Sequence, residues 1–175
     1  MRVNIYEITH MSRASVFYAR GDVFDTPGVL VHQVYCVPLG GAAAGLAAAV
    51  RARLGATDYR RSFEAPLGTI CVEVPPVAGA TTHVVHLRGQ RRPGPPVGDD
   101  DAPAVRLAAF RDALGRLRLW LAAQPPAAVV FPERIGCGLA GGRWDEYRAC
   151  VEEFAAALDP ALHPVVVVAR KHPLP

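Results

Sequence analysis

Residues 135–142 read Ile-Gly-Cys-Gly-Leu-Ala-Gly-Gly, and the chain on either side of them predicts a strand followed by a helix. Ala127 to Phe131 is a short apolar run typical of a buried strand, and a helix is expected from about Trp144 to Leu158. In open α/β sheets, ligands bind beyond the carboxyl ends of the strands. A glycine-rich turn there lets backbone N–H groups approach a phosphate, and the next helix start favours an anion. An ordinary glycine-rich turn is the alternative, because the segment matches neither the P-loop nor the dinucleotide fingerprint.

A second glycine-rich stretch, Gly40 to Leu46, has the same setting. It follows the near-continuous apolar run Gly28 to Tyr35, which predicts a buried strand, and it opens a helix expected over Ala42 to Leu54. Two such turns at one edge of a sheet would suit a ligand with two linked phosphates. The alternative is a simple Ala/Gly-rich helix start.

The rest of the chain alternates between predicted strands and helices. One further helix is expected from about Pro103 to Ala123, with apolar residues near a 3.6-residue period that include Val105, Ala108 and Ala109. The remaining strands are expected at 2–9, 14–19, 68–74, 82–88 and 164–169. This order predicts an α/β fold of three layers, α/β/α, with helices on both faces of a mixed, largely parallel sheet.

The stretch from Gly89 to Pro103 is rich in proline and carries three consecutive aspartates. It predicts a surface loop. Asp101 is expected to cap the following helix, with Pro103 in the first helical turn.

Composition indicates an ordinary globular protein. The chain has 175 residues, is 51% hydrophobic and has a net charge of +3, so we expect one domain over 1–175 with a core of about 14–169. No apolar window predicts a membrane span or a secretory signal peptide. The four cysteines form no CxxC pair and no zinc-type cluster, so we expect reduced thiols in a cytoplasmic protein, without a bound metal or cofactor. Nothing demands more than a monomer.

Several motifs together resemble the macrodomain family. Gly21-Asp22-Val23-Phe24 resembles its GD(I/L)F opening, and the stretch 30–36, LVHQVYC, resembles a VHQVNC strand. Gly45 and Leu46 resemble the end of its GAGLA loop, and 132–139 resembles a P-x-IGCGL signature followed by the helix-start Trp144. The match runs in order over about 14–169. It is similar to the branch of the terminal ADP-ribose protein glycohydrolases and ADP-ribose 1''-phosphate phosphatases.

The resemblance implies an ADP-ribose site. Asp22 would accept a hydrogen bond from the adenine amino group, and the N–H of Val23 would lie nearby. One loop around the distal ribose and a phosphate would include Gly40, Gly41, Gly45 and Leu46, with Gln90 close to it. The diphosphate would be wrapped by Ile135, Gly136, Cys137, Gly138, Leu139 and Ala140. Cys137 would act through packing or its backbone, and not as a nucleophile.

Departures from the family bear on catalysis. The glycohydrolases use a lysine where this chain has Gln90, and an aspartate where it has Ala140; the only lysine is Lys171. The lysine mechanism is therefore not expected. His32 corresponds to a histidine with a proposed role in the phosphatases, but core packing is the alternative. Three functions remain open: an enzyme on ADP-ribose derivatives by a lysine-independent route, a silent reader of ADP-ribose, or a diverged pocket that serves a protein or nucleic-acid partner.

Overall fold

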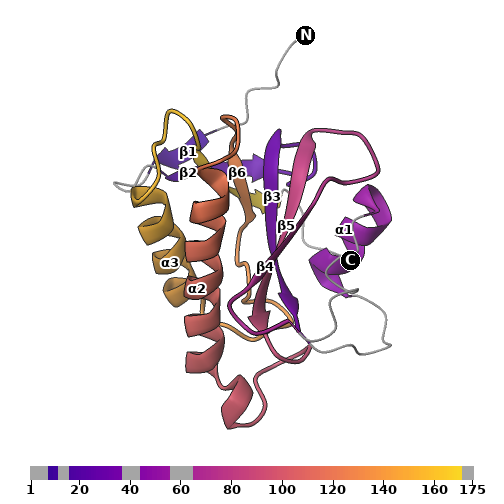
Figure 1. Ribbon diagram of the computed structural model, residues 1–175, viewed down its shortest axis with the longest axis vertical. Coiled ribbons are helices and arrows are strands. Elements are labelled where there is room, and N and C mark those ends of the chain that lie inside the picture. The colour runs from indigo at the N-terminus through magenta and orange to yellow at the C-terminus, as the bar shows by residue number, and fades with distance from the viewer. Residues whose placement is uncertain (1–7, 12–15, 37–43, 56–64, 171–175) are drawn as a thin grey trace.

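The computed structural model describes residues 8–11, 16–36, 44–55 and 65–170 (Figure 1). These residues form a seven-stranded sheet with the strand order β1-β2-β7-β6-β3-β5-β4. The strands are β1 Ile8–Met11, β2 Val16–Gly21, β3 Gly28–Tyr35, β4 Ile70–Glu73, β5 Thr81–Gln90, β6 Val129–Pro132 and β7 Val165–Arg170. The helices are α1 Gly45–Leu54, the short 3-10 helix η2 Asp99–Asp101, α2 Pro103–Leu121 and α3 Trp144–Ala156.

The inner strands of this sheet are parallel. β3 pairs with both β5 and β6 in parallel, and β7 pairs in parallel with β6 and β2. Only the outer strands β1 and β4 run antiparallel to their neighbours among the described strands. The predicted mixed, largely parallel sheet is therefore confirmed.

Helices cover both faces of the sheet, so the predicted three layers are also confirmed (Figure 1). Side chains alternate along each strand. In β3, Val29 and Val31 belong to the larger core cluster with α2 and α3, whereas Leu30 belongs to the smaller cluster with α1. The α1 face also receives His32, because it lies two residues after Leu30.

Parallel pairing places the ends of β2, β3, β5 and β6 at one edge of the sheet, which we call the carboxyl edge. Asp22 follows β2, Gln90 ends β5, and the segment 135–142 follows β6. The distant sequence motifs therefore meet at the same edge. The helices in the described part of the chain include none long and apolar enough to cross a membrane.

The structure corrects three local predictions. β5 continues to Gln90, so the connection to α2 begins at Arg91 and not at Gly89. Gly45 is the first residue of α1, with φ 56°, and not a residue of a helix interior. The buried face of α2 includes Arg106 and Ala109, whereas Ala108 is exposed.

Candidate functional site

The turn after β6 is stabilised by its own backbone. The N–H of Cys137 donates to the carbonyl of Arg134 at 2.9 Å, and the N–H groups of Gly141 and Gly142 donate to the carbonyls of Gly138 and Gly136 at 3.0 Å. Gly136 and Gly141 both have φ 72°. Because L side chains disfavour this left-handed conformation, glycine is needed at these two positions.

Close packing explains why Gly136 cannot carry a side chain. A Cβ at Gly136 would lie 2.4 Å from Cε1 of Tyr147 and 2.8 Å from Oε1 of Gln33. Gly138 differs, because a Cβ there would meet no atom within 4 Å. The Gly136 end of the turn therefore packs against α3 and β3, while Gly138 faces open space.

Three consecutive N–H groups of this turn are available to a ligand. No described residue accepts a hydrogen bond from the N–H of Gly138, Leu139 or Ala140, although the neighbouring amides of Cys137, Gly141 and Gly142 are all bonded within the turn. Gly138 and Leu139 are exposed and Ala140 is partly exposed. Successive amides of this kind are able to donate hydrogen bonds to an anion.

The start of α1 lies beside this turn. A Cβ at Gly45 would be 3.5 Å from Cδ1 of Leu139, so the described end of the segment 40–46 lies next to this turn. The N-cap residue Ala44 has no side-chain hydrogen bond to the first turn of α1. The first amides of the helix, including that of Leu46, therefore add a partial positive charge next to the turn. Gly40 and Gly41 lie outside the described residues.

The predicted adenine end of the site is formed by the turn after β2. Oδ1 of Asp22 accepts a hydrogen bond of 3.0 Å from the N–H of Phe24, and Oδ2 is paired with Nη1 of Arg53. The N–H of Val23 has no acceptor among the described residues, and its contact with a ligand stays a prediction. Arg53 was not identified from the sequence; its guanidinium lies 4.4 Å from the centre of the Phe24 ring.

Gln90 uses its side chain inside the protein. Its Oε1 accepts a hydrogen bond of 3.0 Å from Gln33, and its Nε2 donates to the carbonyl of Arg92 at 2.9 Å. The residue is only 7% exposed. The amide thus links β3, β5 and the following loop, and a direct ligand contact by this side chain remains a prediction.

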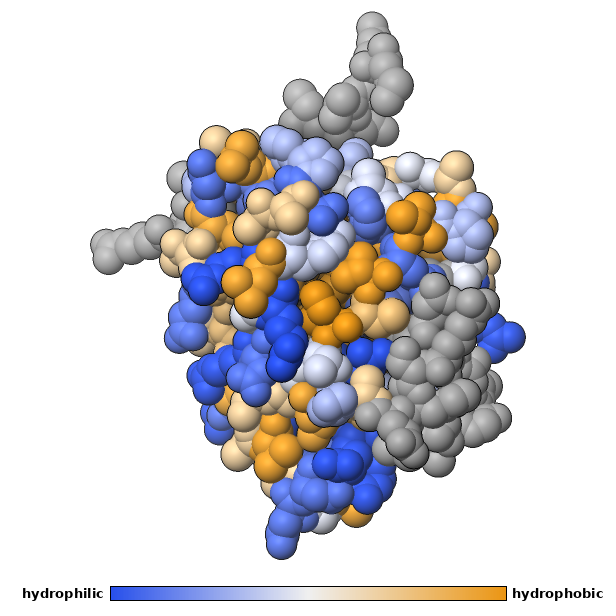
Figure 2. Space-filling model, in the orientation of Figure 1, coloured by the Kyte–Doolittle hydropathy of each residue, from blue (hydrophilic) through white to orange (hydrophobic). Residues whose placement is uncertain are grey.

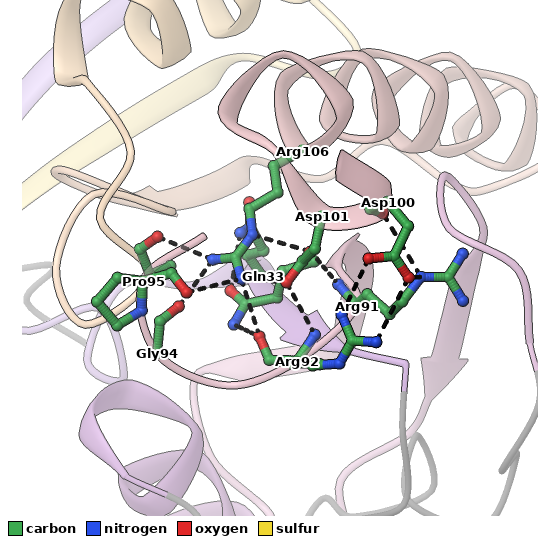
Figure 3. A network of polar contacts seen from close by, with 10 residues as sticks. Gln33, Arg91, Arg92, Gly94, Pro95, Asp100, Asp101 and Arg106 are labelled. Carbon is green, nitrogen blue, oxygen red and sulfur yellow. Dashed lines mark hydrogen bonds and ion pairs between the residues drawn. The ribbon is translucent and has the colours of Figure 1, made fainter. Parts of the chain in front are cut away.

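Arg106 and Asp101 form a buried ion pair next to the carboxyl edge of the sheet (Figure 3). Asp101 does not cap α2 as predicted, because Ala102 is the N-cap and makes no side-chain cap. Instead its carboxylate accepts hydrogen bonds from the backbone N–H groups of Arg91 and Arg92 and from the guanidinium of Arg106. Burial raises its pKa, but these hydrogen bonds outweigh burial and hold the pKa below its ordinary value.

The sequence carries one signal for a buried Arg106. Positions 106, 109, 110 and 113 share one helix face, and the last three are buried Ala, Phe and Ala. An arginine in line with such a face indicates a buried, paired guanidinium.

Cys137 is unsuited to nucleophilic chemistry. Burial raises the pKa of its thiol to about 11, and the thiol donates to the carbonyl of Ile135 at 3.2 Å. Ile135 is itself a core residue, and its N–H donates to Pro132. The side chains of Ile135 and Cys137 both belong to the larger core cluster and so anchor the turn to the protein interior.

His32 lies in the interior beneath α1, with an exposure of 1%. Its Nε2 is 2.6 Å from Nδ1 of His86, and Nε2 of His86 is 3.5 Å from Oε2 of Glu73. Burial, followed by the proximity of His86, lowers the pKa of His32 well below its ordinary value. His32 is therefore neutral near pH 7 and packed against its partner strand, which agrees with the packing alternative.

Comparisons with known proteins concern the fold as a whole. No protein-family model and no curated protein matches the sequence. Solved structures do match: the macrodomain of Mycobacterium tuberculosis DarG has a TM-score of 0.67 at 20% identity, over 87% of this chain and 96% of that one. A protein from Bacteroides thetaiotaomicron has a TM-score of 0.65 at 26% identity, over 87% and 97% of the two chains.

The Oceanobacillus iheyensis macrodomain matches in structures with ADP and with ADPR. The structure with ADP has a TM-score of 0.65 at 16% identity, over 90% of this chain and 84% of that one. A mutant of the same macrodomain with ADPR has a TM-score of 0.63 at 15% identity, over 90% and 85%.

Proposed function

Because this chain has the macrodomain fold, we propose that it binds ADP-ribose, or a molecule carrying an ADP-ribose group, at the carboxyl edge of its sheet. The observation that carries the proposal is the row of unpaired amides at Gly138, Leu139 and Ala140. A diphosphate would accept hydrogen bonds from these groups, and the start of α1 would contribute its partial positive charge.

The adenine end supports the same ligand. The carboxylate of Asp22 is partly exposed and can accept a hydrogen bond from the adenine amino group, while the N–H of Val23 can donate to the ring. Helix α1 joins the two ends of the site: its first residue, Gly45, lies beside Leu139, and Arg53 in its last turn contacts Asp22. One ligand along this helix would reach both groups.

For the finer function we favour a reader of ADP-ribose over an ADP-ribosyl hydrolase or an ADP-ribose 1''-phosphate phosphatase. A catalytic group must reach the substrate. His32 is buried on the α1 face of the sheet, and its ring is directed to His86. The side chain of Gln90 is hydrogen-bonded to Gln33 and to the carbonyl of Arg92. Ala140 has no acidic group. The unpaired amides lie at the exposed turn, whereas the candidate reacting groups are buried or missing.

Calorimetric titration with ADP-ribose tests binding. We expect the wild-type protein to bind, and Gly138→Val to bind at least about tenfold more weakly, because its side chain enters the space over the unpaired amides. Gly79→Val is the matched control, since a Cβ at Gly79 also meets nothing within 4 Å. It should bind as the wild type does. No binding by the wild-type protein at millimolar ADP-ribose would favour a diverged pocket with another partner.

Phosphate release from ADP-ribose 1''-phosphate separates reader from enzyme. The reader proposal expects no turnover above the uncatalysed rate. Turnover that disappears in His32→Ala would contradict it and assign His32 a catalytic role.

A further inference from the structure

Arg106 is the most highly connected buried side chain beside the proposed site (Figure 3). Its Nε donates to Oδ1 of Asp101 at 3.0 Å, and its Nη2 pairs with Oδ2 of the same carboxylate. The remaining hydrogen bonds go to four backbone carbonyls, those of Gly94 at 2.8 Å, Ala140 at 2.9 Å, Arg92 at 3.2 Å and Pro95 at 3.3 Å. The guanidinium therefore holds two separate backbone segments at once.

The two segments also touch directly. A Cβ at Gly141 would lie 3.3 Å from Cδ of Pro96 and 3.5 Å from Cα of Pro95. The loop from Arg91 to Gly98 thus packs along the glycine-rich turn, and Arg106 lies behind both. The outer surface of this region is mixed: Val97 and Leu139 are exposed apolar side chains, and charged side chains lie around them. The lower part of the view in Figure 2 shows both blue and orange surface. Exposed Arg92 pairs there with Asp100 at 3.1 Å.

Arg106 influences the direction in which the unpaired amides point, because it donates a hydrogen bond to the carbonyl of Ala140. A trans peptide directs its carbonyl and its N–H to opposite sides. When the Ala140 carbonyl points to Arg106, the N–H of the same peptide, that of Gly141, points away and donates to Gly138. This closes the turn 138–141 and leaves the N–H groups of Gly138, Leu139 and Ala140 outside it.

We propose that Arg106 is a positioning residue for diphosphate binding, which fixes the turn 138–141 and the loop 91–98 as one wall of the site. The inference rests on the proposed binding of ADP-ribose. Only arginine offers the planar fork of five N–H groups that this set of acceptors requires, and lysine offers a single ammonium. A buried ion pair is also weak evidence for stability alone, because apolar residues often replace such pairs without loss.

The test compares Arg106→Lys with Arg116→Lys, the same substitution at an exposed position of the same helix. ADP-ribose and adenosine are titrated separately, because adenosine lacks the diphosphate. For Arg106→Lys we expect affinity for ADP-ribose to fall by about tenfold to a hundredfold, through loss of preorganised amides. Affinity for adenosine should change by less than about threefold, and Arg116→Lys should change neither. Equal losses for both ligands would mean a general structural role and would overturn the proposal.

A second readout does not depend on ligand. In 15N-resolved spectra of the ligand-free protein, Arg106→Lys should shift the amides of Gly138 to Gly142 and leave those of Asp22 to Phe24 in place. Unchanged signals from the turn would overturn the positioning role even if ADP-ribose binds. Shifted signals in a protein that binds no ADP-ribose would instead refute the proposed function alone.

If Arg106→Lys does not fold, the double variant Asp101→Asn with Arg106→Gln replaces it, because it leaves no lone charge in the interior. We expect the same selective loss of ADP-ribose affinity, since the fork that holds the Ala140 carbonyl is gone. Wild-type affinity in a folded double variant would overturn the proposal.

Discussion

The carboxylate of Asp22 is paired with the guanidinium of Arg53, and both side chains stay close to half exposed, at 40% and 45%. Asp22 is the residue expected to accept the adenine amino group, so Arg53 occupies an acceptor that the ligand would use. Ion pairs at this exposure contribute little to stability, from about 0 to 1 kcal/mol. The pair therefore contributes little to the fold, and its removal tests the adenine contact proposed for Asp22.

Arg53→Ala should tighten the binding of adenosine by about twofold to fivefold, because it frees Oδ2 of Asp22 from an exposed ion pair. Adenosine is used because it is neutral. Loss of the positive charge of Arg53 therefore does not change a charge–charge attraction between the ligand and the protein. Arg51→Ala, exposed in the same helix, is the control and should change nothing. Weaker adenosine binding by Arg53→Ala would show that Arg53 contacts the ligand directly.

Gly136→Ala should destabilise the protein by about 2–4 kcal/mol in urea unfolding, since the new methyl group meets Tyr147 and the backbone has φ 72°. Gly94→Ala separates the two causes. Gly94 has φ 84°, but a Cβ there meets nothing within 4 Å, so only the strain of about 1–2 kcal/mol is expected. Equal effects of the two substitutions would rule out the contact with Tyr147 as a cause.

The stability of the protein should fall between pH 10 and pH 12 in part because of Tyr147. Burial raises the pKa of its phenol from 10.0 to about 12, so the unfolded chain loses this proton at lower pH than the folded protein does. The contribution of the Tyr147 phenol to the free energy of unfolding is complete below pH 10 and is lost as the pH rises through 12, by about 3 kcal/mol. Tyr147→Phe should show a shallower decline of the urea midpoint over this interval. A decline as steep as that of the wild type would contradict the assignment.

Acid should also destabilise the protein, through His32. Its pKa is lowered in the folded state by burial and by His86, so below pH 6.5 the unfolded chain binds a proton that the folded protein does not. The contribution of neutral His32 to the free energy of unfolding is therefore complete above pH 6.5 and is lost as the pH falls. His32→Gln supplies an amide that can donate to or accept from Nδ1 of His86, and it removes the titrating group. Urea midpoints measured from pH 7 to pH 5 should decline less in this variant than in the wild type.

The sequence by itself determined the elements and their order. Apolar runs marked the inner strands because a strand covered by helices on both faces is apolar throughout, and β3 over Gly28–Tyr35 has the bounds predicted for it. Glycine spacing also marked the turn at 135–142, because close approach of backbone to backbone excludes side chains. These signals are local, so a single sequence carries them.

Only the tertiary structure decided which polar groups are left for a ligand. The sequence predicted Gln90 as a ligand contact and Asp101 as a helix cap, but Gln33 and Arg106, from other elements, use their hydrogen-bonding groups. Arg53 reaches Asp22 from another element in the same way. A hydrogen bond between distant residues leaves no periodic pattern, because it depends on where the strands and helices bring each side chain. The N–H groups of Gly138, Leu139 and Ala140 are left unpaired because the folded turn bonds its neighbouring amides to its own carbonyls, and the sequence does not show that pairing.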